Sequence, residues 1–265
     1  MKALLLAAGL GTRLQPYTEE LPKCLFPIQG EPILEHWINL LRINGFKDIY
    51  INTHYLSNQV IDFIKYCEIK YKININILHE TELLGTAGTI SKNYYNLFDK
   101  EELFVAHVDN WITTDLKSFF SSWKLQKSIY DIGMVTFKSD SPESCGIVNI
   151  DESNIVIEFL EKVKYPPHNI ANGAIYILSK NACSWISKHS PKDISIDVIP
   201  EFLGNIWAWQ INGTLRDIGS VESWLKAQKE MPKLLLPKSY MKWNNQYSEL
   251  EIHKHIKGLM QCTQQ

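Results

Sequence analysis

The chain lacks several features that would mark common protein classes. Its five cysteines form no Cys-x-x-Cys pair, which argues against a zinc site and a disulfide framework and favours reduced thiols. It has no basic run interleaved with aromatic residues, and its formal net charge is -2, so nucleic acid is not an expected partner. No internal repeat is visible.

Long apolar runs are also missing. The apolar run at the N-terminus stops at Gly9, and Arg13 follows soon after, which is too short for a signal-peptide core and for a membrane span. We therefore expect no membrane as a partner and a cytoplasmic location. A buried first strand is the better interpretation of this run.

The composition is that of a folded protein. Hydrophobic residues make up 45% of the 265 residues and charged residues 21%, which argues against disorder and coiled coils. A chain of this length suits one large α/β domain.

Short apolar runs alternate with helical periodicity along the first half of the chain, which is typical of a doubly wound sheet. The predicted strands are Ala3–Ala8, Asp48–Asn52, Ile73–Leu78 and Leu103–Val108, and the predicted helices are Pro32–Leu41, Val60–Tyr66 and Ala87–Tyr95. Further short strands are predicted at Ile132–Phe137, Gly146–Ile150, Ile155–Leu160 and Ala174–Leu178. Because few helices separate these later strands, we expect antiparallel additions to the same sheet. The prediction is one α/β catalytic domain over residues 1–230 with a mixed sheet, and a C-terminal helical appendage over 231–265 with a helix near 250–260.

The most informative segment is a glycine turn directly after the first strand. Gly9 and Gly11 leave backbone amides free to approach phosphate oxygens, because no side chain blocks them. The Gly-x-Gly-x-x-Gly pattern of dinucleotide-binding proteins does not match, because Leu14 occupies the position of its third glycine. The chain also has no Walker phosphate-binding loop. A glycine turn followed by two cations, Arg13 and Lys23, remains.

These residues resemble the signature of the sugar-1-phosphate nucleotidylyltransferases. The matching residues are Leu6-Ala7-Ala8-Gly9-Leu10-Gly11-Thr12-Arg13-Leu14, Pro16, Thr18, Pro22-Lys23-Cys24-Leu25 and Pro27-Ile28. The resemblance continues through Gly85-Thr86-Ala87-Gly88, Asp109-Asn110, Cys145-Gly146-Ile147-Val148, Glu161-Lys162, Asn172-Gly173-Ala174 and Asp217-Ile218-Gly219. Mannose-1-phosphate and heptose-1-phosphate guanylyltransferases are the most similar subfamily. The family fold is a Rossmann-like mixed α/β sheet, in agreement with the pattern of strands and helices.

The resemblance implies transfer of a nucleoside monophosphate from a nucleoside triphosphate to a sugar 1-phosphate, with Mg²⁺ as cofactor. It assigns Arg13 to the departing β and γ phosphates, Lys23 to the α phosphate, and Asp109 and Asp217 to Mg²⁺. Lys162 joins Arg13, Lys23 and Asp109 among the implied catalytic residues. The other implied substrate-binding residues are Ala8, Gly9, Gly11, Thr12, Glu80, Gly85, Thr86, Gly88, Gly146, Glu161, Asn172 and Gly173. The implied pathway is nucleotide-sugar biosynthesis for cell-surface polysaccharide.

Glu80 leads us to predict GTP as the nucleotide. It stands at the end of the strand Ile73–Leu78 and before the glycine turn at Gly85, where the family binds the base. Guanine presents two adjacent donors, for which a carboxylate supplies two acceptors, whereas uracil presents carbonyl oxygens that a carboxylate repels. Solvent exposure of Glu80, with the base contacted by backbone groups, is the alternative.

Departures from the family pattern leave other interpretations open. The family usually has glycine just before the metal aspartate, whereas this chain has Val108 after His107, so we expect a changed ligand geometry there. A uridylyltransferase for amino sugars or a cytidylyltransferase for phosphocholine remains an alternative. A catalytically silent regulatory subunit is disfavoured, because Arg13, Lys23 and Asp109 are all present. Assembly into a homo-oligomer is left open.

Overall fold

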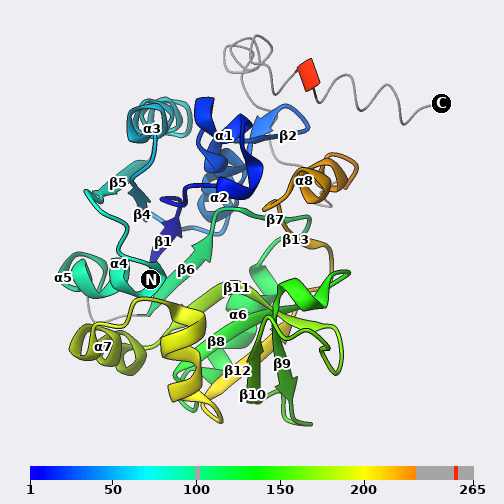
Figure 1. The fold of residues 1–265 in the computed structure, drawn as a ribbon. Coiled ribbons are helices and arrows are strands. Elements are labelled where there is room, and N and C mark those ends of the chain that lie inside the picture. Colours follow the sequence, from blue (N-terminus) through cyan, green and yellow to red (C-terminus); the bar gives the residue numbers. More distant parts are fainter. Residues whose placement is uncertain (99–101, 231–253, 256–265) are drawn as a thin grey trace.

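The computed structural model describes residues 1–98, 102–230 and 254–255, and it is built around a mixed sheet with helices on its faces (Figure 1). Its strands are β1 (Lys2–Leu6), β2 (Pro27–Ile28), β3 (Glu31–Pro32), β4 (Asp48–Thr53), β5 (Asn74–His79), β6 (Leu103–His107), β7 (Asn110–Ile112), β8 (Ile132–Lys138), β9 (Gly146–Ile150), β10 (Val156–Glu161), β11 (Ile170–Leu178), β12 (Ile206–Gln210) and β13 (Leu215–Asp217). Its helices are α1 (Tyr17–Glu20), α2 (Ile33–Ile43), α3 (Ser57–Tyr71), α4 (Thr86–Lys92), α5 (Tyr94–Leu97), α6 (Lys117–Gln126), α7 (Lys180–His189) and α8 (Val221–Ala227).

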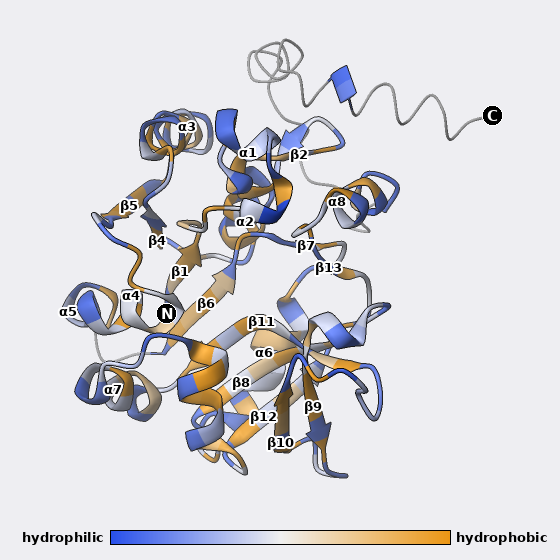
Figure 2. Ribbon diagram, in the orientation of Figure 1, coloured by the Kyte–Doolittle hydropathy of each residue, from blue (hydrophilic) through white to orange (hydrophobic). Residues whose placement is uncertain are grey.

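Four neighbouring parallel strands form the first half of the sheet, in the order β5-β4-β1-β6. Ala3, Leu4 and Leu5 of β1 are fully buried, and Leu4 lies opposite Tyr50 on one side and Val105 on the other. A strand inside a parallel sheet is covered on both faces by the connecting helices, which explains its continuous apolar run. Figure 2 shows the hydrophobic colour along these inner strands. The predicted doubly wound sheet is confirmed.

The second half of the sheet is mainly antiparallel. Strand β11 pairs in antiparallel fashion with β6, β8 and β9, and β9 pairs in the same way with β10. The expected antiparallel additions are therefore confirmed. Strand β12, which the sequence analysis did not predict, pairs in parallel with β8.

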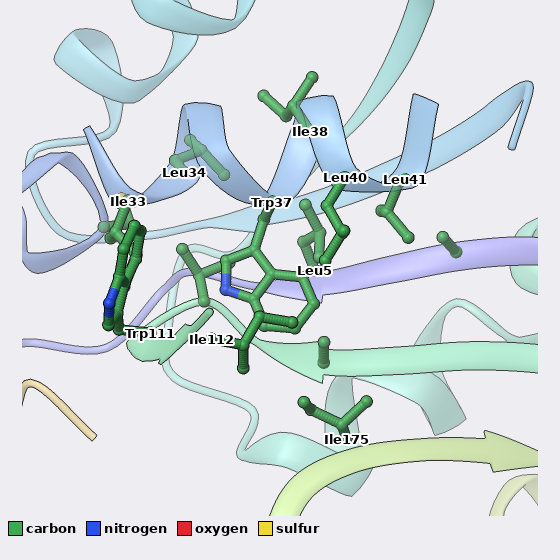
Figure 3. Packing of buried hydrophobic residues seen from close by; sticks show 14 of the residues in the cluster. Leu5, Ile33, Leu34, Trp37, Ile38, Leu40, Leu41, Trp111, Ile112 and Ile175 are labelled. Atoms are coloured by element: carbon green, nitrogen blue, oxygen red, sulfur yellow. The ribbon is translucent and has the colours of Figure 1, made fainter. Parts of the chain in front are cut away.

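Helix α2 connects the core to the region that follows β6. Trp37 of α2 is fully buried, and Figure 3 shows it beside Leu5 and Ile112. Its indole nitrogen donates a hydrogen bond to the carbonyl oxygen of Asn110 at 2.9 Å. Truncation of a buried tryptophan to alanine typically costs about 3–5 kcal/mol. The packing of α2 thereby fixes the backbone immediately after Asp109.

Two predicted elements are longer in the structure: Val60–Tyr66 is part of α3, and Ala174–Leu178 is part of β11. Two others differ for local reasons. Strand β1 ends at Leu6 instead of Ala8, because the amide of Ala7 donates to the side chain of Asn52 at 2.6 Å. The predicted helix Ala87–Tyr95 is divided into α4 and α5 at Asn93, whose side chain donates to the carbonyl of Thr89 at 2.9 Å.

The predicted appendage over 231–265 and its helix near 250–260 lie outside the described residues, apart from 254–255. In the part of the chain that the structure describes, no helix has both the length and the apolar character needed to cross a membrane.

Candidate active site

A cavity of about 210 Å³ lies where the carboxyl ends of β1, β4 and β6 meet, which is where open α/β sheets bind ligands. Its lining residues are Leu6, Ala7, Ala8, Gly9, Lys23, Cys24, Asn52, Glu80, Leu83, Gly85, Thr86, His107, Val108 and Asp109. The structure thus brings together in one cavity these residues that the sequence analysis selected: Ala8, Gly9, Lys23, Glu80, Gly85, Thr86 and Asp109.

The glycine turn after β1 has one open and one crowded glycine. No atom of the described residues lies within 4 Å of where a Cβ of Gly9 would stand, so a ligand has room to approach the backbone there. Gly11 has a φ of +66°, and a Cβ on it would meet Cγ2 of Thr18 at 2.7 Å. The exposed residues Thr12 and Arg13 begin the short 3-10 turn that follows. Gly11 is therefore required by the shape of the turn, whereas Gly9 borders open space that a ligand can enter.

Strand pairing brings the two predicted metal aspartates together. Asp109 follows β6 directly, and Asp217 ends β13, which pairs with β7 so that Asp217 lies opposite Asn110. The amide of Ile218 donates a hydrogen bond to the carbonyl oxygen of Asp109 at 2.9 Å. The hydroxyl of Ser223 in α8 donates to the carbonyl oxygen of Asp217. The backbone therefore fixes the two carboxylates next to each other.

Lys23 lies between these carboxylates. Its Nζ is 2.6 Å from Oδ2 of Asp109 and 3.1 Å from Oδ1 of Asp217, and its side chain is only 10% exposed. Arg13 approaches the other oxygen of Asp217, with Nη2 at 3.3 Å from Oδ2, and is 67% exposed. Gly219 leaves space for this contact, since a Cβ there would meet Oδ2 of Asp217 at 2.6 Å. The four charged groups balance one another.

The pKa shifts follow from this arrangement. Burial acts to lower the pKa of Lys23, but the carboxylates of Asp109 and Asp217 outweigh it and raise the pKa above its usual value. Burial acts to raise the pKa of Asp109, but the ammonium of Lys23 outweighs it through its charge and its hydrogen bond and holds the pKa below its usual value. Both partners are therefore charged at neutral pH.

The donor set fits Mg²⁺. Asp109 and Asp217 provide carboxylate oxygens, and a buried ammonium already occupies the space between them as a stand-in cation. Among the described residues, no group of three or more His, Cys, Asp or Glu side chains is placed to hold a metal. Mg²⁺ suits such a site, because it is usually held by one or two carboxylates together with substrate phosphates and water.

The two residues before Asp109 have separate roles. Val108 is 1% exposed and packs among the same buried hydrophobic residues as Leu5 and Trp37. The core thus accommodates its side chain, and Val108 also lines the cavity. His107 lines the cavity, and its Nε2 is buried without a hydrogen-bond partner among the described residues. Burial lowers the pKa of His107, against the opposing effect of Asp109, so the ring is neutral. An imidazole is a poor ligand for Mg²⁺.

Glu80 is 2% exposed and lies in a network of donors. Its Oε1 accepts from Nδ2 of Asn52 at 2.9 Å and from Oγ1 of Thr89 at 2.6 Å, and its Oε2 accepts from the amide of Leu84 at 3.2 Å. A carboxylate has about four lone-pair sites, so one site on Oε2 is left for a ligand. The expected two-point contact with guanine therefore needs one of these chain donors to be displaced.

The turn before α4 is anchored to a distant segment. The carbonyl oxygen of Lys192 accepts from the amides of Ala87 at 2.9 Å and Gly88 at 3.2 Å, and it lies against the position that a Cβ of Gly85 would occupy. Gly85 also has a φ of +82°. The packing of the turn therefore requires glycine at Gly85, whereas a Cβ on Gly88 would make only ordinary contacts, the nearest at 3.4 Å. Of Gly85, Thr86 and Gly88, the first two line the cavity.

The residues expected to bind the sugar lie on the antiparallel half of the sheet and do not line the described cavity. Gly146 pairs with Glu161, and a Cβ on Gly146 would meet Oε2 of Glu161 at 2.8 Å. Lys162 has a φ of +47°, is 67% exposed, and has its Nζ 3.2 Å from Oε1 of Glu161.

Asn172 and Gly173 form an irregularity in β11. Nδ2 of Asn172 donates to the hydroxyl of Tyr176 at 2.6 Å, and its Oδ1 accepts from the amide of Ala174 at 3.0 Å. The carbonyl oxygen of Gly173 accepts from Nδ2 of Asn110 at 3.0 Å. Asn110 thereby connects this bulge to Asp109, its neighbour in the chain.

Asn52 is a site residue that sequence reasoning missed. It is the last residue but one of β4, is 4% exposed, and joins the amide of Ala7 to the carboxylate of Glu80. Its signal was present in the sequence, because Asn52 is a polar residue at the carboxyl end of a strand that neighbours β1.

Comparisons with known proteins agree with this geometry. The family model described as "Nucleotidyl transferase" matches residues 2–233. The chain is 32% identical to mannose-1-phosphate guanylyltransferase 1 of Arabidopsis thaliana over 230 residues, which cover 85% of this chain and 63% of that protein. It is 33% identical to D-glycero-alpha-D-manno-heptose 1-phosphate guanylyltransferase of Campylobacter jejuni over 181 residues, which cover 68% of this chain and 77% of that protein.

Solved structures show the same fold. HddC from Yersinia pseudotuberculosis, also solved in a complex with GMP-PN, has a TM-score of 0.71. The uncomplexed structure is 27% identical and covers 86% of this chain and 98% of that one. A putative glucose-1-phosphate thymidylyltransferase from Bacillus anthracis has a TM-score of 0.81 at 23% identity, covering 92% of this chain and 99% of that one.

Proposed function

Because the chain belongs to the nucleotidyl transferase family, we propose that it transfers GMP from GTP to mannose 1-phosphate or heptose 1-phosphate and releases pyrophosphate. The observation that carries this proposal is the group formed by Lys23, Asp109 and Asp217 beside the glycine turn after β1. Lys23 and Asp109 line the cavity, and Asp217 and Arg13 join them through ion pairs. Two carboxylates and two cations in contact suit a reaction between two polyanions.

The chemistry needs alignment and charge neutralisation more than proton transfer. The phosphate of the sugar 1-phosphate attacks the α phosphorus of the triphosphate, the new P–O bond forms, and the bond to pyrophosphate breaks. Because the second pKa of a phosphate monoester is about 6, the nucleophile is already largely ionised at neutral pH. We therefore assign no general base.

The chain's own charged groups divide this work. Arg13 binds the departing β and γ phosphates through its planar guanidinium, and Lys23 binds the α phosphate. Asp109 and Asp217 would hold Mg²⁺, which supplies charge neutralisation of the triphosphate. The open backbone at Gly9 gives the nucleotide room to approach the amides of the turn.

The acceptor site is the second part of the proposal. Glu161 and Lys162 bind the sugar and its phosphate, and Asn172 and Gly173 lie near the sugar ring. The hydrogen bond from Asn110 to Gly173 supports this arrangement, because it ties the bulge in β11 to the residue after Asp109.

GTP is the proposed nucleotide for two reasons. Glu80 is buried at the cavity and retains an acceptor site on Oε2 for a donor of the base. The relatives from Arabidopsis thaliana and Campylobacter jejuni are named guanylyltransferases, and HddC was solved in a complex with GMP-PN. The chain spans 63% of the length of the Arabidopsis relative. The choice of GTP therefore rests on Glu80 of this chain as well as on the names of its relatives.

The location and destination of the product belong to the same proposal. The described cysteines are all free thiols, which suits the reducing cytoplasm. The sugar nucleotide would be consumed in the synthesis of cell-surface polysaccharide.

A substrate matrix tests the proposed function. The four nucleoside triphosphates are each combined with mannose, heptose, glucose and N-acetylglucosamine 1-phosphates and with phosphocholine, and pyrophosphate release is measured with Mg²⁺ present. We expect GTP with mannose or heptose 1-phosphate to give the highest rate. A higher rate with UTP and an amino-sugar 1-phosphate, or with CTP and phosphocholine, would contradict the proposal.

A further inference from the structure

The ammonium of Lys23 and the proposed metal would compete for the same two carboxylates. Nζ of Lys23 lies within hydrogen-bond distance of one oxygen of Asp109 and one oxygen of Asp217. These carboxylates are the only residues assigned to Mg²⁺. A divalent cation and an ammonium that both contact the same pair of carboxylates would also repel each other strongly.

The charge of the site is already balanced in this arrangement. Arg13 and Lys23 carry two positive charges, and Asp109 and Asp217 carry two negative charges. Lys23 makes the closer contacts and is 10% exposed, whereas Arg13 is 67% exposed and its contact is longer. Screening by water therefore weakens the contribution of Arg13 more than that of Lys23. The neutralisation of this carboxylate pair depends mainly on Lys23.

We propose that Lys23 is the resident counter-ion of Asp109 and Asp217 in the nucleotide-free protein and that it keeps divalent metal out of this site until a triphosphate draws its ammonium away. The inference rests on the proposed function, because a phosphate is the group that attracts Lys23. The two carboxylates are then released to the metal at the moment when the phosphates arrive.

Lys23 is suited to such an exchange of partners. Its charge is compact and sits on a flexible four-carbon stem, and its described hydrogen bonds from Nζ go only to the two aspartates. The backbone of the aspartates is held by the β7–β13 pairing, so the carboxylates stay in place when the ammonium moves. Nucleotide and metal should therefore each increase the affinity of the protein for the other, since coupling between two ligands is reciprocal.

The test measures Mn²⁺ binding without any nucleotide. Free Mn²⁺ is quantified by electron paramagnetic resonance during titration of the full chain and of its Lys23→Met and Lys23→Gln variants. Because both variants remove the competing charge, we expect Mn²⁺ to bind them at least about tenfold more tightly than it binds the parent protein. The melting temperature should also rise more with Mn²⁺ in these variants than in the parent. If folded Lys23→Met and Lys23→Gln bind Mn²⁺ no more tightly than the parent, the proposal is wrong.

Three further variants separate charge from other effects. Lys23→Arg keeps a cation between the carboxylates and should bind Mn²⁺ as weakly as the parent, even if it is inactive. Lys127→Met breaks a remote pair, whose Nζ lies 2.9 Å from Oε1 of Glu102, and should leave Mn²⁺ binding unchanged. Combining Lys23→Met with Asp217→Asn should abolish the gain, and retention of the full gain would place the metal elsewhere and overturn the proposal.

This outcome is independent of the outcome of the substrate matrix. A parent protein that forms a sugar nucleotide, with neutral Lys23 variants that bind Mn²⁺ no more tightly, would overturn only the counter-ion role. A parent protein that turns over no substrate pair, with the expected gain in Mn²⁺ affinity, would overturn only the proposed reaction.

Discussion

The amide of Ile218 donates a hydrogen bond to the carbonyl oxygen of Asp109 at 2.9 Å. This bond extends the pairing of β13 with β7, so the main chain that carries Asp217 is aligned with the main chain that carries Asp109. The relative position of the two carboxylates is consequently set by backbone pairing, and their side chains can be changed without loss of that pairing.

Asp109→Asn tests the metal assignment. The substitution preserves volume and removes charge, so we expect the fold to remain and kcat to fall by about 10²-fold or more. Activity of the parent should disappear when divalent metal is chelated and return when Mg²⁺ or Mn²⁺ is added. Circular dichroism confirms the fold of the variant. Turnover near the parent rate with metal present would remove Asp109 from the metal site.

Arg13→Lys tests contact with the leaving group. Lysine keeps the charge but loses the planar fork that binds two phosphate oxygens, so the rate should fall while GMP binding stays nearly unchanged. Arg42→Lys is a matched control, since Arg42 bonds to Asn39 within α2. Stopped-flow rates and calorimetric affinities measure both effects. Equal weakening of GMP and GTP binding would move Arg13 away from the β and γ phosphates.

Glu80→Gln tests recognition of the base. A glutamine amide replaces an acceptor with a donor, so we expect the preference for GTP over UTP in kcat/KM to fall by about tenfold or more, with a smaller effect on the total rate. Because Glu80 is buried among three donors, the melting temperature should fall as well. The exposed neighbour Glu82→Gln is the control and should change neither quantity. An unchanged GTP preference in a folded variant would mean that other groups recognise the base.

Gly85→Ala tests the anchored turn before α4. A Cβ on Gly85 would collide with the carbonyl of Lys192, and its φ of +82° is strained for alanine, so we expect a loss of about 3 kcal/mol in the free energy of unfolding. Gly45 has a similar φ of +83° but no atom within 4 Å of its Cβ position. Gly45→Ala therefore introduces only the backbone strain and no collision. Urea denaturation should show a smaller loss in its free energy of unfolding than in that of Gly85→Ala. Equal losses in the two variants would show that Lys192 does not restrict Gly85.

His36 predicts a dependence of stability on pH. Burial lowers the pKa of His36 to about 4, against a smaller opposing effect of a hydrogen bond to the backbone of Ile112. In the unfolded chain His36 has a pKa of about 6.5 and is protonated first as the pH falls. The free energy of unfolding is therefore unaffected by His36 above about pH 6.5 and decreases as the pH falls toward 4, by up to about 3 kcal/mol.

His36→Phe measures this contribution. Phenylalanine retains a ring against Trp111, whose centroid lies 4.4 Å from that of His36, and removes the titration. Urea unfolding at pH 7.5 and pH 4.5 should show a smaller loss of stability in the variant than in the parent. The same loss in both proteins would exclude His36 as the cause.

The strand pattern was predictable because it follows from burial. Buried parallel strands require apolar runs, and the run at Leu103–Val108 agrees with β6 to within one residue at each end. The edge strand β5 is partly exposed, and the alternation of Ile and Asn in Ile73–Leu78 predicted it to within one residue at each end. Strand β12 was missed although its signal was present in the sequence, since its apolar run lies between the turn dipeptides Gly204-Asn205 and Asn212-Gly213. The division at Asn93 was missed because periodicity does not show which polar side chain will bond to the backbone.

The site was predictable where residues stand at strand ends or in the glycine turn, and the family prediction is confirmed. The contacts between these residues were not. The bridge from Lys23 to Asp217 joins parts of the chain that only the β7–β13 pairing brings together, and no local pattern announces that pairing. The donors around Glu80 likewise come from three separate segments: Asn52 in β4, Leu84 in the loop before α4, and Thr89 in α4. The roles of the individual site residues stay predictions.

The central claim is that the chain transfers the GMP unit of GTP to a sugar 1-phosphate. The most direct test uses GTP with a radioactive label in the α phosphate and, separately, GTP with the label in the γ phosphate. With mannose or heptose 1-phosphate and Mg²⁺, label in the α phosphate should appear in a GDP-sugar, and label in the γ phosphate should appear in pyrophosphate. Chelation of the metal should stop both. Release of γ label as orthophosphate, or no transfer of α label to any of the sugar phosphates, would contradict the account.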